Sequence, residues 1–376
     1  ELVTAKLDDY ELINVGLIKN GALLLSKAYG QGVIDGEYQY GSVSKPLTST
    51  IILILRQKGL IKSLDDNVWE YLPDLKNAMP DRYKGSPLTL RHLLTHTSGI
   101  PHNDEPPLID RKFNLKFKPG TGYQYSTPAY GILGLVIEAV SGSSYSDAVH
   151  KLLGEPVGAP SLHAMSSFIA PGAFVVSTIR DMALYAIGMM TGVYLPQEIL
   201  TGEAWRPVSR KYGLGWSVEN VGGPELTVFH GGSNGLPRAY LLMKPVKKTG
   251  VVLFGTAKSF DSDGMNSLAE SLLAFLEDLP KAEILTALLR DDIEYLLGKG
   301  IRIAKDQDHG IRDYPEEKRS PADRRPHDHR IVKNDMKRNT AVMAVMAYVL
   351  ADMLDKARAN LLRVGLEDAV TFSQQR

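Results

Sequence analysis

The sequence of 376 residues contains no cysteine. Disulfide bonds, thiolate nucleophiles and cysteine-ligated zinc are therefore excluded. The sequence also has no excess of either charge, because 43 Lys and Arg residues balance 43 Asp and Glu residues. A chain with zero net charge carries no electrostatic signature of a nucleic-acid partner, so we expect none. A small neutral or peptidic substrate fits this composition better.

Long hydrophobic runs are also missing. The longest, residues 341–351, is shorter than the roughly 20 residues that a membrane-spanning helix needs. No basic region followed by an apolar region marks a signal peptide at the start of the sequence. We therefore expect a soluble protein without a membrane span, and its compartment stays open. With 44% hydrophobic residues, the chain can bury one large core and carry an appendage.

The first part of the sequence predicts a hairpin followed by a helix. Residues 13–18 and 22–29 are apolar runs joined by Asn20-Gly21, a dipeptide that suits the positive φ angles of a tight turn. Residues 42–58 then read as a helix of about four turns. An antiparallel sheet edge and one long helix are the expected result.

The middle of the sequence changes in character twice. Residues 60–160 are short helical segments broken by Pro and Gly, and short strand-like runs follow at 227–229, 239–243 and 251–254 before a helical stretch at 267–279. This order predicts an α+β fold, an antiparallel sheet flanked by helices with an inserted helical subdomain. The predicted catalytic domain covers residues 1–279, with a sheet part at about 1–58 and 165–279 and a helical part at about 59–164.

The last part of the chain, residues 280–376, is predicted to be a charged linker and a C-terminal helix. Residues 302–338 are rich in charge and poor in large apolar side chains, as in a solvated linker. Residues 340–363 have apolar positions at helical spacing. A single amphipathic helix does not fold alone, so we expect it to dock on the catalytic body or on another subunit, which would give a homo-oligomer.

The clearest chemical motif is Ser42-Val43-Ser44-Lys45. On a helix, this spacing places the hydroxyl and the amine on one face, one turn apart. A serine hydroxyl is a weak nucleophile until a base takes its proton, and a lysine shielded from water has a lowered pKa. Lys45 could therefore be the base for Ser42. Alone, the motif also fits an ordinary surface pair.

Further motifs stand beside it in a definite order. They are Gly41 to Pro46 (GSVSKP), Leu88 to Gly99 (LTLRHLLTHTSG), Tyr125-Ser126-Thr127, Tyr212 to Trp216 (YGLGW) and His230-Gly231-Gly232. Together they resemble the serine β-lactamase and penicillin-binding-protein superfamily, in the branch of class C β-lactamases, DD-peptidases, D-aminopeptidases and related esterases. The resemblance covers roughly residues 12 to 279.

The resemblance implies a role for each matching residue. It makes Ser42 the acylated nucleophile, Lys45 its partner and Tyr125 a relay that moves a proton between nucleophile and leaving group. It places His230 where other branches have the lysine of a Lys-Thr-Gly triplet; there a histidine could orient Tyr125 or, titrating near neutrality, bind a carboxylate. The backbone N–H groups of Ser42 and Ser233 would form the oxyanion hole.

The substrate-binding predictions rest on three residues. Gly231 and Gly232 would leave room for substrate beside the strand. Thr127 stands where the family commonly has an asparagine whose amide contacts substrate amide groups, which argues against specific recognition of a β-lactam. We expect an acyl-enzyme hydrolase of short peptides or simple esters, a peptidase or esterase. A catalytically silent penicillin-binding sensor or scaffold, and a true β-lactamase, are the alternatives.

Two other motifs are better explained without catalysis. Lys248-Thr249-Gly250 spells the family's third motif, but it lies between strand-like runs and is interpreted as a turn. His92 and His96 are four residues apart, yet no glutamate follows His92 directly, so a metal site is not predicted there. We expect neither a metal nor a cofactor.

Overall fold

The structure is a computed structural model that describes residues 3–102, 112–259 and 264–278. The predicted linker and terminal helix at 280–376 lie outside the described residues.

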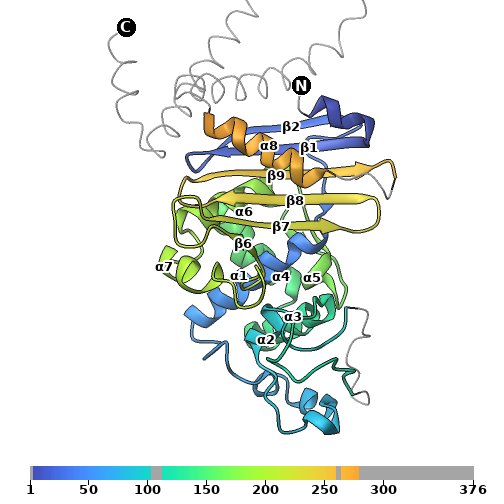
Figure 1. Ribbon diagram of the computed structural model, residues 1–376, viewed down its shortest axis with the longest axis vertical. Helices are drawn as coiled ribbons and strands as arrows, with labels where there is room; N and C mark the ends of the chain where they lie inside the picture. The colour runs from blue at the N-terminus through green and yellow to red at the C-terminus, as the bar shows by residue number, and fades with distance from the viewer. Residues whose placement is uncertain (1–2, 103–111, 260–263, 279–376) are drawn as a thin grey trace, which may run out of the picture. The chain divides into compact units, whose positions relative to one another are not determined.

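A six-stranded antiparallel sheet forms the centre of the body that contains the motifs (Figure 1). Its strands follow the order β2-β1-β9-β8-β7-β6, so the N-terminal hairpin pairs with the last strand in the chain. The strands are β1 (Tyr10–Lys19), β2 (Ala22–Gly30), β6 (Ser217–Glu219), β7 (Thr227–Ser233), β8 (Pro237–Lys244) and β9 (Thr249–Ala257). The predicted antiparallel sheet, with a helical segment inserted between its first and last strands, is confirmed.

The hairpin turn has the geometry that its sequence predicts. Asn20 and Gly21 both have positive φ angles, 53° and 76°. Two successive residues in this region match the right-handed twist of the flanking strands. The turn therefore places Lys19 opposite Ala22, and the register shifts once along the hairpin, between Leu17 and Ile18.

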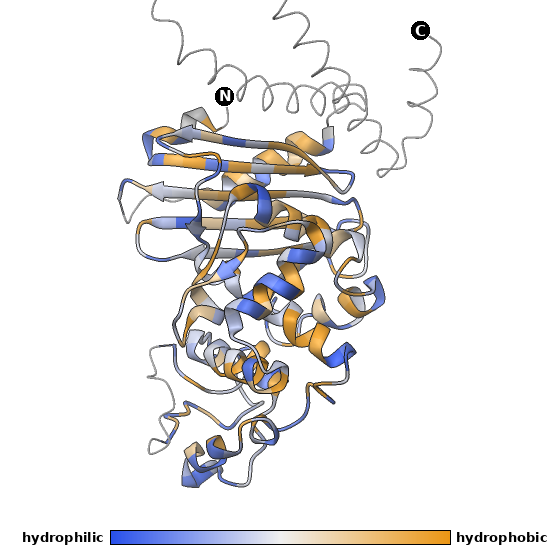
Figure 2. Ribbon diagram, turned by 180° about the vertical axis from the view of Figure 1, so that it is seen from behind, coloured by the Kyte–Doolittle hydropathy of each residue, from blue (hydrophilic) through white to orange (hydrophobic). Residues whose placement is uncertain are grey.

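Helices cover both faces of the sheet. α8 (Met265–Asp278) packs on β8 and β9, whereas α6 (Ile179–Thr191) packs on β1, β2 and β9 from the other side (Figure 1). Figure 2, drawn from behind, shows hydrophobic residues along these strands and along the helices on that face. The core thus lies between the sheet and the helices that pack on it.

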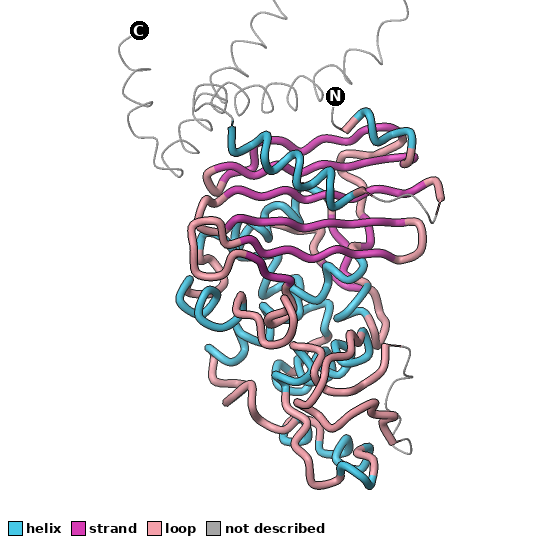
Figure 3. The backbone as a smooth tube through the Cα atoms, in the orientation of Figure 1, coloured by secondary structure: helices cyan, strands magenta, loops and turns pink. Residues whose placement is uncertain are grey.

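The helical part is rich in loops (Figure 3). Its α-helices are α2 (Leu90–Leu94), α3 (Thr127–Ser141) and α4 (Tyr145–Val149), and two short α-helices, α5 (Ala170–Ala173) and α7 (Gln197–Ile199), follow outside its predicted range. Short 3-10 helices lie at Thr4–Asp8, Gly41–Val43 (η2), Val68–Glu70, Pro73–Ala78, Asp81–Tyr83 and Glu155–Val157, and π-helical turns at His150–Gly154 and Leu200–Ala204. A second small sheet contains β3 (Tyr38–Gln39), β5 (Val175–Ser177) and β4 (His163–Ala164), in that order.

The long helix α1 (Ser44–Gln57) runs through the middle of the body. Every residue from Ser44 to Leu55 is buried, so this helix is enclosed on all sides and not only along one stripe. It ends before Gly59, whose φ of 76° suits a residue beyond a helix C-terminus. The first turn of a fully enclosed helix is a rigid place for reactive side chains.

Candidate active site

Ser42 lies on η2, directly before α1, and Ser44 holds this turn in place. The Ser44 hydroxyl donates to the Gly41 carbonyl at 2.7 Å and accepts from the Val175 amide at 2.9 Å. Gly41 has a φ of 54°, and a Cβ there would lie 2.7 Å from the Ser233 nitrogen. Only glycine allows this close approach at a positive φ. The turn therefore brings Ser42 and Ser233, from distant parts of the chain, to the same place.

The side chain of Lys45 is completely buried. Its Nζ lies 3.1 Å from Ser42 Oγ, 3.2 Å from Thr127 Oγ1 and 2.8 Å from the Gly172 carbonyl oxygen. Burial lowers the pKa of Lys45 well below its usual value, because the ammonium loses its hydration. A neutral amine has two protons and one lone pair. All three partners are oxygen atoms that can accept from the amine, and in its neutral form the amine also has a lone pair that can take the Ser42 proton.

Tyr125 lies in the loop before α3, close to both Ser42 and Lys45. The Lys45 amine lies 4.6 Å from the centre of the Tyr125 ring, and the Ser42 hydroxyl is near enough to the phenol to influence its pKa. Burial raises the pKa of Tyr125, and the Ser42 hydroxyl only partly opposes this shift. The phenol therefore keeps its proton and is suited to donate it.

Thr127 is the first residue of α3, and its side chain is buried against Lys45. Its hydroxyl oxygen accepts a hydrogen bond from the Lys45 amine, so an acceptor position of this hydroxyl is already occupied within the protein. The hydroxyl proton has no acceptor within hydrogen-bonding distance among the described residues. This proton is available to an oxygen atom of a bound molecule.

His230 lies on β7 and makes different contacts from those predicted. Its Nδ1 is 2.7 Å from the Gly231 carbonyl, which can only accept, so Nδ1 carries the proton. The Nε2 lone pair then accepts from the Tyr212 hydroxyl at 3.0 Å. The ring centres of His230 and Tyr125 are 6.3 Å apart. His230 is thus hydrogen-bonded to Tyr212, and its two ring nitrogens are both occupied.

The prediction that His230 titrates near neutrality is wrong. Its pKa is lowered to about 3, mainly by burial and to a lesser extent by the nearby Lys45, against an opposite effect of the Gly231 carbonyl. The imidazole is therefore neutral at pH 7. A neutral imidazole has no positive charge to attract a carboxylate, so the structure does not support carboxylate binding through a protonated His230.

Strand β7 brings a free edge next to Ser42. β6 pairs only with residues 227–229 of β7, whereas residues 228–233 pair with β8 on the other side. Gly231 is exposed, as expected for a residue beside a substrate. For Gly232 the reason is different, because a Cβ there would lie 2.1 Å from the Tyr40 carbonyl oxygen and 3.1 Å from the Ser42 nitrogen. Gly232 is required by the protein's own backbone.

Of the two motifs interpreted as non-catalytic, Lys248-Thr249-Gly250 lies away from this cluster, whereas His96 of the other packs against Tyr125. Lys248 has a φ of 49° and lies in the turn between β8 and β9, at the opposite end of the sheet from Ser233. Thr249 and Gly250 already belong to β9, so the predicted turn is shorter than expected. Among the described residues, no group of three or more His, Asp or Glu side chains is arranged to hold a metal ion.

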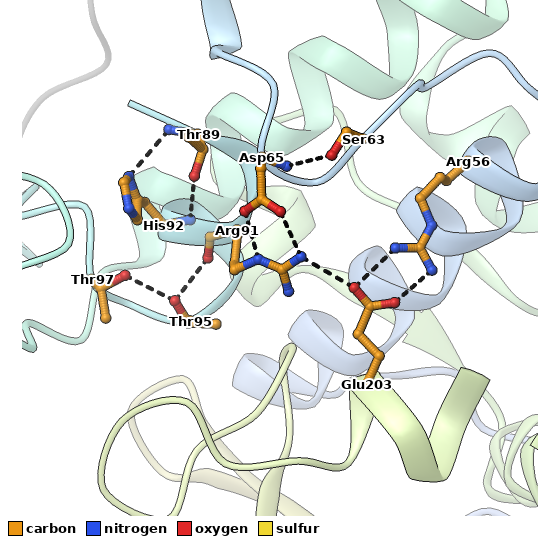
Figure 4. Close-up of polar contacts among 9 residues, drawn as sticks. All are labelled: Arg56, Ser63, Asp65, Thr89, Arg91, His92, Thr95, Thr97 and Glu203. Carbon is orange, nitrogen blue, oxygen red and sulfur yellow. Dashed lines mark hydrogen bonds and ion pairs between the residues drawn. The ribbon is translucent and has the colours of Figure 1, made fainter. Parts of the chain in front are cut away.

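A cavity of about 360 Å³ is lined by residues other than Ser42, Lys45, Tyr125 and His230. Its lining comes from Arg91, His92, Thr95, Thr97, Gly120, Thr121, Gly122, Tyr123, Val208 and Ser209. Arg91 lies between two carboxylates, with Nε 2.7 Å from Asp65 and Nη2 3.3 Å from Glu203, which also binds Arg56 of α1 (Figure 4). This network links α1 to the loops around α2, and its charges are already paired.

Sequence reasoning missed three groups that complete the site. The Gly172 carbonyl is a backbone group that no side-chain motif reveals. Tyr212 belongs to the Tyr-Gly-Leu-Gly-Trp motif, which carried the resemblance without receiving a role. Ser44 stands inside the Ser-x-x-Lys motif, where its spacing to Gly41 was a usable signal for the hydrogen bond that holds the turn.

The family comparison agrees with this geometry. The family model described as Beta-lactamase matches residues 11–274. The chain belongs to this family. Its members include the serine β-lactamases and penicillin-binding proteins that the motifs resemble.

The chain is also similar to curated proteins and to solved structures. Protein flp of Staphylococcus aureus is 24% identical over 299 residues, which cover 65% of this chain and 59% of the relative. Penicillin-binding protein 4* of Bacillus subtilis is 31% identical over 141 residues, 32% of this chain and 29% of the relative. The chain thus spans less than two thirds of the length of these relatives.

Two solved structures show the same fold at low sequence identity. An octameric penicillin-binding protein homologue from Pyrococcus abyssi has a TM-score of 0.63 and 23% identity, covering 73% of this chain and 76% of that one. A D-stereospecific amidohydrolase from Streptomyces sp. has a TM-score of 0.57 and 21% identity, covering 72% of this chain and 95% of that one. In the part of the chain that the structure describes, no helix has the length and apolar character to cross a membrane.

Proposed function

We propose that this protein is a serine hydrolase that acts on short peptides or simple esters through an acyl-Ser42 intermediate. The observation that carries the proposal is the buried amine of Lys45, 3.1 Å from Ser42 Oγ, with its pKa well below the usual value. An inert surface pair would have a hydrated, charged lysine. A desolvated lysine beside a serine is the arrangement that activates a hydroxyl.

In the proposed acylation, Ser42 Oγ attacks the substrate carbonyl carbon while its proton passes to the neutral Lys45. The backbone N–H groups of Ser42 and Ser233 stabilise the resulting oxyanion. Tyr125 donates its phenol proton to the leaving group as the carbonyl–leaving-group bond breaks, and recovers a proton from Lys45. Water then attacks the ester, and the same groups act in reverse. His230 remains neutral throughout.

The substrate class follows from the free edge of β7 and from Thr127. An extended peptide or ester chain can lie beside residues 231–233, where the edge of β7 opposite β8 is not covered by β6. The Thr127 hydroxyl can donate its proton to a carbonyl oxygen of the substrate. It has no side-chain amide that could both donate to and accept from an acylamino group. The D-stereospecific amidohydrolase among the structural neighbours supports a peptide substrate, and preference for D-residues is part of this proposal.

A panel of substrates tests the proposed class. We expect kcat/KM for nitrocefin to be lower than kcat/KM for a dipeptide anilide and for a p-nitrophenyl ester. The variant Thr127→Asn should raise the ratio of kcat/KM for nitrocefin to kcat/KM for the anilide about tenfold to a hundredfold. The reason is that an asparagine amide can accept from Lys45 and still donate to the substrate. Steady-state kinetics measures this ratio.

The matched control for this experiment is Thr127→Val, which keeps the shape but removes the hydroxyl. It should lower kcat/KM for all substrates without favouring nitrocefin. A wild-type ratio well above one would identify a true β-lactamase instead. Stable penicilloylation without hydrolysis of any substrate would indicate a sensor or scaffold.

The pH dependence is expected to report Lys45. Only the neutral amine accepts the Ser42 proton, so kcat/KM should rise with pH as Lys45 loses its proton. Because the pKa is lowered by burial, the rise should end below the ordinary lysine value of 10.5. Tyr125 stays protonated over this range, since its pKa is raised.

A pH profile of kcat/KM checks this expectation, with His230→Gln as the control. The rising limb should persist in this variant, because the pKa of His230 is about 3 and lies below the measured range. If the limb disappears with His230, the titrating base is this histidine and not Lys45.

Self-association is a further part of the proposal. The structural neighbour from Pyrococcus abyssi is octameric, and the predicted terminal amphipathic helix needs a surface to cover its apolar side. A homo-oligomer formed through residues 340–363 would meet this need.

A further inference from the structure

His96 contacts Tyr125 and both of its neighbours in the chain, through the backbone carbonyl and the side chain of His96. The amides on the two sides of Tyr125 both bind this one residue: Gln124 N donates to the His96 carbonyl oxygen at 2.8 Å, and Ser126 N donates to His96 Nδ1 at 3.1 Å. The His96 ring also packs on the Tyr125 ring, with centres 4.2 Å apart. One residue thus fixes the backbone on each side of the tyrosine and the plane of its ring.

The conformation of His96 is costly, which argues that the contacts matter. Its φ is 59°, in the left-handed region that only a few per cent of non-glycine residues adopt, although histidine does so more often than most. The residue is completely buried, and Nε2 has no hydrogen-bond partner among the described residues. Strain and an unsatisfied buried nitrogen both cost stability, and such costs concentrate at functional sites.

The protonation state of His96 is fixed by the same geometry. Nδ1 accepts a hydrogen bond from Ser126 N and therefore carries no proton, which leaves the proton on Nε2. The ring centres of Tyr123, Tyr130 and Tyr212 lie 4.8 to 5.9 Å from that of His96, and those of Tyr123 and Tyr212 lie 6.4 Å from each other. These side chains carry no charge that would stabilise an imidazolium. His96 is a neutral support and not a proton carrier.

We propose that His96 is a positioning residue for Tyr125, which it holds at the distance from Ser42 that proton donation to the leaving group requires. This inference rests on the proposed acyl-Ser42 mechanism and adds a requirement to it. Tyr125 sits in a loop without helical or strand pairing of its own, so its placement depends on outside contacts. Misplacement of a catalytic group by about 1 Å costs roughly a hundredfold in rate.

The test uses His96→Gly and His96→Asn. Glycine tolerates the positive φ but removes the acceptor and the ring, whereas asparagine tolerates it and its amide oxygen can replace Nδ1. We expect kcat for a dipeptide anilide to fall about a hundredfold in His96→Gly, with KM little changed. His96→Asn should recover about tenfold of this loss by restoring the bond to Ser126.

A comparison of two leaving groups distinguishes a defect in the position of Tyr125 from a general loss of structure. A p-nitrophenolate leaves without a proton, whereas an anilide needs one, so a defect in Tyr125 should affect the anilide far more than the p-nitrophenyl ester. In the Tyr125→Phe background, removal of His96 should cost no more than about twofold further. His92→Asn is the matched control, because His92 makes a similar amide contact to Thr89 outside the site and should leave kcat unchanged.

The outcomes distinguish this inference from the proposed function. Activity that survives in Ser42→Ala would overturn the mechanism itself. If activity depends on Ser42 but His96→Gly slows anilide and ester equally, or adds its full cost in the Tyr125→Phe background, His96 does not act through Tyr125. Thermal unfolding of each variant shows whether the fold is intact, and His96→Asn supplies the test if His96→Gly does not fold.

Discussion

Replacement of Ser42 by alanine is expected to lower hydrolysis by at least about 10⁴-fold and to abolish labelling by a fluorophosphonate probe. No other serine among the described residues has its hydroxyl within hydrogen-bonding distance of the buried Lys45 amine, which lies 3.1 Å from Ser42 Oγ. Ser42→Ala removes the nucleophile but leaves Lys45 its bonds to Thr127 and Gly172, so the fold should be kept. Peptide mapping of the labelled wild type should identify Ser42.

The neighbouring Ser44 provides the control. Ser44→Ala removes a buried hydroxyl that joins Gly41 to Val175, at a cost of about 1–3 kcal/mol in the free energy of unfolding. This variant should be less stable than Ser42→Ala and yet be labelled at Ser42. A label on another serine, or full activity of Ser42→Ala, would remove Ser42 from the mechanism.

Much of the fold could be predicted because local patterns and tertiary packing agree. The Asn20-Gly21 turn, α1 and the three last strands of the sheet were readable from turn chemistry and from apolar runs. α6 was missed, although Thr178 accepts a hydrogen bond from Asp181 N at its start and Gly192 follows its end with a φ of 79°. Its glycine and β-branched content obscured a helix whose stability comes from packing on the sheet.

The site was readable where its chemistry depends on side chains close in sequence. Ser42 and Lys45 are one helical turn apart, so spacing alone predicts their contact. The partner of His230 could not be predicted in this way, because Tyr212 reaches it through the folding of a separate loop. Its burial, which sets its pKa, is a property of the packed body and not of the motif.

Gly232 illustrates a similar limit. Its position in a strand beside the nucleophile suggests room for substrate, whereas the structure uses this room for the Tyr40 carbonyl. A glycine in a motif indicates close approach of something, and the sequence does not say whether that is a ligand or the chain itself.

Replacement of Lys45 by methionine is expected to lower kcat/KM by about 10³- to 10⁴-fold, because the base that accepts the Ser42 proton is lost. Methionine has a similar length and no charge to bury. It leaves the Gly172 carbonyl and the Thr127 hydroxyl without the amine, but it also removes the cost of desolvating a lysine. Since these effects oppose each other, the thermal midpoint should change much less than the rate.

The comparison with Lys45→Ala and Lys45→Arg shows which property of the lysine is needed. An arginine stays protonated in proteins and cannot accept the Ser42 proton, so it should be inactive even where it folds. Alanine leaves space beside Ser42, and an added primary amine should restore part of the rate, more so as the pH rises and the amine becomes neutral. If Lys45→Met keeps its activity within about tenfold of wild type, the Ser42 proton goes to another group, and Tyr125 becomes the base in spite of its raised pKa.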